Sequence, residues 1–309
     1  MTSTQNLLEE PNFVQAAEIR RRRDNAEKWE ELKNYIHNPR DGTIFKEDRT
    51  NWAYTVIYYA AFWVGLTVLF VVSMAFFMVD IDDIDPAVQG MDSPLKLNPG
   101  MAMRPVPDFQ TTLIRFQQGK PQTYKHYTDH IQAFLWQYEN EEQVGENFID
   151  CSNGRPPDTR YKVCRFNLDV LGDGCVWQKD YGYDEGQPCI LFKLNRIFDW
   201  VPEQYLPSEV PPQIADRWHP NYIAVTCEGE FPQDLENIGN ITYLPRYGLP
   251  ADFYPYLNQE GFRSPLLMVK FEKPANGVAI SIVCKIWVKN VSHDSNDQTG
   301  LIRFQLLVD

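Results

Sequence analysis

The chain has 309 residues, of which 42 are acidic and 29 are basic, so its formal net charge at pH 7 is −13. A charge of this sign argues against nucleic acid as a partner, because phosphate backbones bind basic surfaces. Most of the acidic excess lies beyond residue 79, where 230 residues follow (309 − 79), enough for one sizeable domain.

The first 52 residues are predicted to form a polar tail of nearly balanced charge. Residues 1–12 predict no ordered element, whereas the composition of residues 13–36 favours a helix. Three apolar residues recur on this helix at helical spacing, namely Trp29, Leu32 and Ile36. The basic run Arg20–Arg23 could bind anionic lipid heads, but neighbouring acidic residues dilute it. A charged helix exposed to solvent is therefore the favoured prediction.

Residues 53–79, AYTVIYYAAFWVGLTVLFVVSMAFFMV, contain no Asp, Glu, Lys, Arg or His. A helix rises about 1.5 Å per residue, so this stretch is long enough to cross a hydrocarbon core of about 30 Å. Basic residues precede it and acidic residues follow it: Lys33, Arg40, Lys46 and Arg49 before, and Asp80, Asp82, Asp83 and Asp85 after. Basic flanks stay in the cytoplasm, which predicts a type II signal anchor with the N-terminus inside.

Four large aromatic residues lie inside the span as two pairs four residues apart, Tyr58 with Phe62 and Tyr59 with Trp63. Tyrosine hydroxyls at this depth favour a protein partner over bare lipid, and Gly65, Ser73 and Ala75 permit close helix approach. We therefore predict that these aromatics pack against another membrane helix. The alternative is an ordinary aromatic girdle that meets only lipid.

Residues 80–125 are rich in Pro, Met and Asp and predict an extended extracellular stalk. The acidic run at its start lacks the glycine turn and distal Glu of a calcium-binding EF-hand loop. Residues 126–309 then form the predicted ectodomain. Its first element is a helix with one apolar face, made of Tyr127, Ile131, Phe134 and Tyr138.

Beyond this helix the apolar period changes to two. Alternation occurs at 164–170, 190–194, 223–227, 267–271, 278–288 and 302–308. Short alternating segments separated by Pro- and Gly-rich loops are typical of an Ig-like antiparallel β-sandwich. The fold class predicted is mainly β, with one transmembrane helix and one helix inserted in the ectodomain.

The cysteines agree with this topology, since all of them follow the span: Cys151, Cys164, Cys175, Cys189, Cys227 and Cys284. An even number on the oxidising side predicts three disulfides, out of 15 possible pairings. Asn240 and Asn290 begin N-glycosylation sequons on the same side. The spacing of the cysteines and histidines predicts no metal site, and no cofactor is expected.

Motifs of common catalytic chemistry are missing: the sequence has no Walker A pattern, no GxSxG elbow and no HExxH. His126 and His130 are four residues apart but lack the intervening Glu of a zinc protease, so surface histidines are expected. Asp80-Ile-Asp82 has the letters of a glycosyltransferase DxD motif, yet it sits at the membrane exit. The residues alone predict a type II membrane glycoprotein whose ectodomain binds partners or serves a structural role.

The sequence also resembles the β subunits of the Na⁺/K⁺-transporting ATPase and its gastric H⁺/K⁺ relative. The resemblance runs from the juxtamembrane segment to the last strand. It rests on these motifs: Arg49-Thr50-x-Trp52, Tyr58-Tyr59-x-x-Phe62-Trp63, Cys164-Arg165-Phe166, Tyr181-Gly182-Tyr183, Lys193-Leu194-Asn195-Arg196, Tyr254-Pro255-Tyr256 and Cys284-Lys285. The two sequons resemble invertebrate members more than the heavily glycosylated gastric form.

The resemblance implies a non-catalytic subunit that folds, stabilises and delivers to the plasma membrane the catalytic α subunit of a P-type cation ATPase, and that modulates K⁺ and Na⁺ transport. It implies the lipid bilayer and a small regulatory single-span subunit as further partners, with Tyr254 and Tyr256 joining the span aromatics in partner binding. It also implies disulfides in sequence order, Cys151–Cys164, Cys175–Cys189 and Cys227–Cys284. The alternatives are a cell-adhesion glycoprotein without a pump and an H⁺/K⁺ ATPase β subunit.

Overall fold

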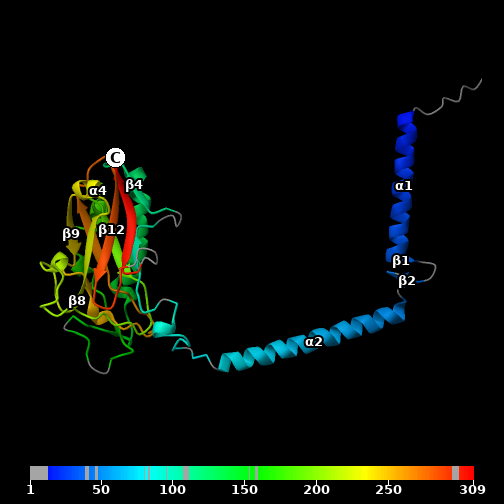
Figure 1. Ribbon diagram of the computed structural model, residues 1–309, viewed down its shortest axis with the longest axis horizontal. Helices are drawn as coiled ribbons and strands as arrows, with labels where there is room; N and C mark the ends of the chain where they lie inside the picture. The colour runs from blue at the N-terminus through cyan, green and yellow to red at the C-terminus, as the bar shows by residue number, and fades with distance from the viewer. Residues whose placement is uncertain are drawn as a thin grey trace, which may run out of the picture. The chain divides into compact units, whose positions relative to one another are not determined.

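The computed structural model describes residues 13–38, 42–45, 48–79, 81–82, 84–94, 96–106, 111–152, 154–156, 159–293 and 299–309. It divides into two compact units, Met1–Ile81 and Asp82–Asp309, which are taken separately below (Figure 1). Several predictions fall outside the described residues. These are the lack of order in residues 1–12 and the charge flanks at Arg40, Lys46, Asp80 and Asp83.

The first unit consists of two helices, α1 (Phe13–Ile36) and α2 (Arg49–Val79), with the short paired strands β1 (His37–Asn38) and β2 (Thr43–Ile44) between them. The predicted helix at 13–36 is confirmed. The apolar helix is also confirmed, and it begins before Ala53. Asp48 starts it, since its carbonyl accepts from the Trp52 amide at 3.0 Å and its carboxylate accepts from the Thr50 hydroxyl at 2.8 Å.

Two sheets build the second unit. One has the strand order β10 (Leu249–Pro250), β8 (Tyr222–Gly229), β12 (Ala279–Trp287), β13 (Leu301–Val308) and β4 (Leu113–Phe116). The other has the order β3 (Met101–Arg104), β7 (Cys189–Leu194), β11 (Leu267–Glu272) and β9 (Asn240–Leu244). A smaller parallel pair joins β5 (Phe148–Ile149) to β6 (Val163–Cys164). In the two large sheets the pairing is antiparallel except where β4 lies parallel to β13.

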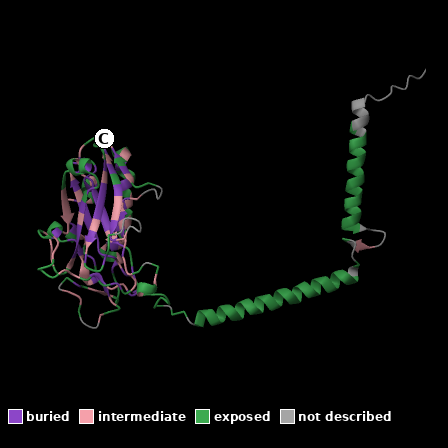
Figure 2. Ribbon diagram, in the orientation of Figure 1, coloured by how far each residue is buried: buried purple, intermediate pink, exposed green. Residues whose placement is uncertain are grey.

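The core lies between these two sheets, where Figure 2 shows the buried strands. Phe304 of β13 contacts Phe192 of β7 and Phe271 of β11, with ring centroids 6.0 Å apart in each case. The Tyr243 hydroxyl of β9 accepts from the Cys227 amide of β8 at 2.8 Å. Strands such as β12 and β13 bury alternate apolar residues here, so their period-two pattern is explained by sheet-on-sheet packing.

A third layer covers the outer face of the four-stranded sheet. It contains α3 (Pro121–Leu135), which buries Tyr124, Tyr127, Thr128, Ile131 and Leu135. Because of this cover, nearly all of β7 is buried on both faces rather than on one. The helix starts at Pro121, where the missing amide costs nothing, and confirms the helix predicted from its apolar face. The other α-helix in the described part of this unit is α4 (Pro232–Asn237).

Two predictions about secondary structure are wrong. The stalk predicted to extend to residue 125 is wrong at 101–104 and 113–116, which form β3 and β4, one strand in each sheet, and from Pro121, where α3 begins. The strand expected at 164–170 ends at Cys164, and a 3-10 helix follows at Leu168–Leu171. Asn167 caps this helix by accepting the Asp169 amide at 2.9 Å, which competes with strand pairing.

Candidate functional site

Four aromatic residues of α2, namely Tyr58, Tyr59, Phe62 and Trp63, form one connected cluster. Tyr58 stacks on Phe62, with centroids 6.5 Å apart, and makes an edge contact with Tyr59 at 5.5 Å. Phe62 in turn meets Trp63 at 6.0 Å. The prediction paired residues four apart, and the structure adds the contacts between sequence neighbours that join the pairs.

This cluster faces outward. The exposed fractions of its four residues are 65, 54, 47 and 63% for Tyr58, Tyr59, Phe62 and Trp63. By length and composition the helix could cross a membrane over Thr50–Val79, and none of its apolar window is buried within the described chain. The Thr67 hydroxyl donates to the Trp63 carbonyl at 2.8 Å, so this polar group is satisfied within the helix. No described residue from the rest of the chain covers the four aromatic rings.

The ectodomain aromatics assigned to partner binding divide into one buried and one accessible residue. Tyr254 is a core residue, 8% exposed, with its ring edge-on to Trp200 at 5.1 Å. Its predicted role in direct partner contact is therefore wrong. The loop turns its ring inward, where apolar burial holds it. Tyr256 is half-buried, and its hydroxyl donates to Asn258 at 3.0 Å.

Arg196 is held beside Tyr256. Its guanidinium lies 5.5 Å from the Tyr256 ring and 5.4 Å from the Phe262 ring, and it donates to the Phe262 carbonyl at 2.8 Å. The residue is nevertheless exposed. Cation–π contacts and one backbone hydrogen bond fix the side chain while part of its donor set still faces solvent.

Two further cations lie close to Arg196. Arg104 of β3 and Lys193 of β7 both face the Phe134 ring of α3, at 5.1 and 6.0 Å from its centroid. Burial lowers the pKa of Lys193, and the positive charges of Arg104 and Arg196 lower that pKa further. No described carboxylate lies within 4.0 Å of any of the three cations. An acidic ectodomain thus carries a local basic patch beside Tyr256, which the sequence analysis did not find.

Three disulfides are present, and they are the pairs that the resemblance implies: Cys151–Cys164, Cys175–Cys189 and Cys227–Cys284. The first follows β5 and closes onto the end of β6. The second ties the loop before the 3-10 helix Trp177–Gly182 to the start of β7. The third joins residues that are direct partners on β8 and β12. Each bond fixes a loop or strand of the ectodomain.

Both sequon asparagines are exposed. Asn240 begins β9, the edge strand of its sheet. Asn290 follows β12, and its amide bridges a neighbouring loop by donating to the Val201 carbonyl at 2.8 Å and accepting the Glu203 amide at 3.0 Å. Exposure is compatible with glycan attachment at either position.

The predicted surface histidines differ in environment. His126 is exposed, whereas His130 is half-buried and its Nδ1 accepts the Val106 amide at 2.9 Å. Burial lowers the pKa of His130, and the nearby Arg104 lowers it further. Its neutral ring thus serves as a structural acceptor. Among the described residues, no group of three or more His, Cys, Asp or Glu is placed to hold a metal ion.

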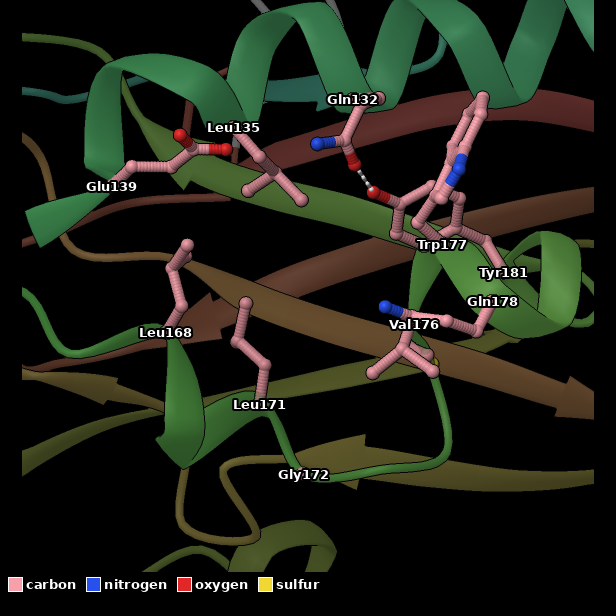
Figure 3. Close-up of a pocket in the computed structure, with 11 residues that line it drawn as sticks. Gln132, Leu135, Glu139, Leu168, Leu171, Gly172, Val176, Trp177, Gln178 and Tyr181 are labelled. Atoms are coloured by element: carbon pink, nitrogen blue, oxygen red, sulfur yellow. Dashed lines mark hydrogen bonds between the residues drawn. The ribbon is translucent and has the colours of Figure 1, made fainter.

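A shallow hollow of about 200 Å³ lies between α3 and the loop closed by Cys175 (Figure 3). Leucines and Trp177 line much of it. The Tyr181 hydroxyl points at Gln132 and donates to its carbonyl oxygen at 2.5 Å. Burial raises the pKa of Tyr181, and the Glu139 charge raises it further, so the phenol stays protonated.

The fold and these surfaces define a class: proteins with one candidate membrane-spanning helix and a disulfide-bonded β-sandwich domain. The family model for the sodium/potassium ATPase beta chain matches residues 22–305. Subunits beta-2 and beta-1 of the sodium/potassium-transporting ATPase of Drosophila melanogaster are each 34% identical to this chain. The first alignment covers 91% of this chain and 93% of the relative, and the second covers 89% and 91%.

A probable beta-3 subunit of Caenorhabditis briggsae is 28% identical, over 91% of this chain and 87% of that protein. The match therefore spans the membrane helix as well as the ectodomain. This chain belongs to the sodium/potassium ATPase β chain family, whose members are non-catalytic subunits of the pump.

Proposed function

We propose that this chain pairs with the catalytic α subunit of a sodium/potassium-transporting ATPase, stabilises it, delivers it to the plasma membrane and modulates its handling of K⁺ and Na⁺. The observation that carries the proposal is the family match, which runs through both α2 and the ectodomain. A subunit that only capped the pump from outside would not need its membrane helix to be part of the match.

Two surfaces are proposed to contact α. The first is the aromatic cluster on α2, where packing and hydroxyl partners rather than hydrophobicity favour a helix over lipid. The second is Tyr256 with the fixed, exposed Arg196, a pair suited to an extracellular loop that presents a carboxylate. Tyr254 supports this surface from the core.

The proposed topology places residues 1–52 in the cytoplasm, 53–79 in the membrane and everything after them outside. The basic residues before the span and the acidic residues after it support this orientation. The disulfides and the two exposed sequons support an extracellular location for the sandwich. The names of the relatives favour the sodium/potassium pump over the proton/potassium pump, and adhesion without a pump has no specific observation in its favour.

The experiment is co-expression with a sodium/potassium ATPase α subunit, followed by detergent extraction and capture of this chain. Tyr59→Leu with Trp63→Leu keeps α2 apolar, so membrane insertion should persist while the yield of captured α and the K⁺ activation of ATP hydrolysis change. Phe76→Leu with Phe77→Leu is the matched control, since both phenylalanines are exposed on the same helix outside the cluster. Equal α yield and equal K⁺ activation for the two variants would exclude the cluster as the interface, and absence of α from the wild-type capture would refute the proposed function.

A further inference from the structure

The helix α1 carries a narrow apolar stripe that nothing in the described chain covers. Trp29, Leu32 and Ile36 are 64, 46 and 43% exposed. A helix turns about 100° per residue, so these three side chains fall within an arc of about 60°. An apolar stripe on a helix that packs in no protein core is expected to contact another protein or a membrane surface.

The charged residues of α1 are sorted around this stripe by sign. Four of the six basic residues lie within about 80° of its midline, taking about 100° per residue: Arg21, Arg22, Lys28 and Lys33. More than about 110° away lie the acidic residues: Asp24, Glu27, Glu30 and Glu31. Glu18 is the exception, because it lies close to the midline and one turn before Arg21 and Arg22. Arg20 and Arg23 fall on the acidic side, so the run of four arginines is divided between two faces.

This sorting matches a membrane surface better than a protein groove. Long basic side chains beside an apolar stripe can extend to phosphate groups while their methylenes and the tryptophan lie in the headgroup region. The acidic face then points away from an anionic surface. A helix that is simply solvated would gain nothing from separating its charges in this way, because exposed ion pairs contribute little wherever they lie.

The bilayer is held close to α1 by the chain itself. Only residues 37–48 separate α1 from α2, and they are partly folded. The Phe45 amide donates to the Ile36 carbonyl at 3.0 Å, and the strands β1 and β2 pair His37 with Ile44. The Phe45 ring contacts Tyr35 of α1 at 5.9 Å and Trp52 of α2 at 6.2 Å. A short tether gives a high effective concentration, so weak surface affinity suffices.

We propose that α1 lies on the bilayer surface as an amphipathic helix. Arg21, Arg22 and Lys28 bind anionic lipid headgroups, and the stripe of Trp29, Leu32 and Ile36 inserts among the headgroups. The inference rests on the proposed function only in requiring that α2 spans the membrane. With the proposed orientation the surface is the cytoplasmic leaflet, where anionic lipids concentrate. This proposal replaces the expectation of a solvated helix. That expectation was based on the nearly balanced number of acidic and basic residues, whereas the proposal is based on which side of the helix each charged residue occupies.

The test uses the full chain in nanodiscs of phosphatidylcholine, with or without phosphatidylserine. The native cysteines are all in disulfides, so a single added cysteine can be labelled with a polarity-sensitive dye. Leu32→Cys reports from the stripe and Glu31→Cys from the opposite side. Dye at position 32 should shift to the blue and resist iodide quenching when phosphatidylserine is present, whereas dye at position 31 should not.

A matched pair of charge variants separates this binding from general attraction. Arg21→Gln with Arg22→Gln removes two cations that precede the stripe on the same side of the helix, and Arg20→Gln with Arg23→Gln removes two from the other side. Each cation near an anionic surface changes the bound-to-free ratio about fivefold. The first variant should therefore lose most of the shift and the second should keep it.

Three results would overturn the proposal. These are equal loss in both charge variants, equal dye environments at positions 31 and 32, or a shift that requires a co-expressed protein rather than phosphatidylserine. Failure of the chain to capture α would leave the dye measurements unchanged, because no pump is present in the nanodisc. The orientation of the chain does not matter either, because both leaflets have the same lipid composition. The lipid proposal and the pump proposal can therefore fail independently.

Discussion

The bond Cys227–Cys284 should be the disulfide on which the ectodomain depends most. Its two cysteines are 57 residues apart in sequence, are direct partners on β8 and β12, and are 7 and 0% exposed. Replacing both by alanine removes the cross-link without adding a polar group to the sheet. The pair Cys151 and Cys164, only 13 residues apart and also buried, provides a control that loses the same atoms.

The magnitude follows from the loop that each bond closes. In the chain-entropy treatment a closed loop of 57 residues corresponds to about 4.2 kcal/mol and one of 13 residues to about 2.9 kcal/mol. With a urea dependence of about 3 kcal/mol per molar, the unfolding midpoint should fall by about 1.4 M for the first double variant and about 1.0 M for the second.

The assay is pulse proteolysis of the full chain in detergent across a urea series, with the intact ectodomain quantified on non-reducing gels. Both variants should retain the wild-type pattern of proteolytic fragments in the absence of urea. A midpoint that stays at the wild-type value for Cys227→Ala with Cys284→Ala would refute the reasoning. So would a larger loss for the Cys151 and Cys164 pair, because loop length would then not govern the effect.

Two further predictions concern single side chains. Asn240→Gln and Asn290→Gln should each remove one glycan step on a gel, but only Asn290→Gln should also cost about 1–2 kcal/mol of unfolding free energy, because it breaks two backbone hydrogen bonds to the 201–203 loop; equal urea midpoints for the two variants would contradict this. The lowered pKa of His130 means that the unfolded state binds its proton more readily, so the stability from the neutral ring is complete above pH 6.5 and is lost as the pH falls toward the lower folded-state pKa. His130→Asn keeps an acceptor for the Val106 amide and should flatten that acid loss, while the exposed His126→Asn should leave the pH profile of the urea midpoint unchanged.

The membrane helix, the helix at residues 13–36 and the later strands were predictable from the sequence because each depends on local chemistry. A long apolar stretch without charged residues predicts a membrane span, and alternating apolar residues predict a strand with one face buried in a core. Residues 278–288 show this clearly, since β12 covers Ala279–Trp287. The family resemblance added the disulfide pairing, which spacing alone left among 15 arrangements.

The short strands β3 and β4 could not be predicted from the local sequence. Each has only four residues, too few for a clear alternating pattern, and each forms where a partner strand supplies its hydrogen bonds. The same holds for the inward turn of Tyr254, whose place is set by Trp200 far earlier in the chain. Packing overrides local preference at such positions.

Among surfaces, the sequence by itself determined the aromatic cluster of α2, because helical spacing alone brings Tyr58 and Phe62 together. Only the tertiary structure decided the basic patch, in which Arg104, Lys193 and Arg196 meet around rings from α3 and the loop after β10. The register of β3 against β7 places Arg104 and Lys193 on the same outer face, and that register is fixed by hydrogen bonds between residues about 90 positions apart.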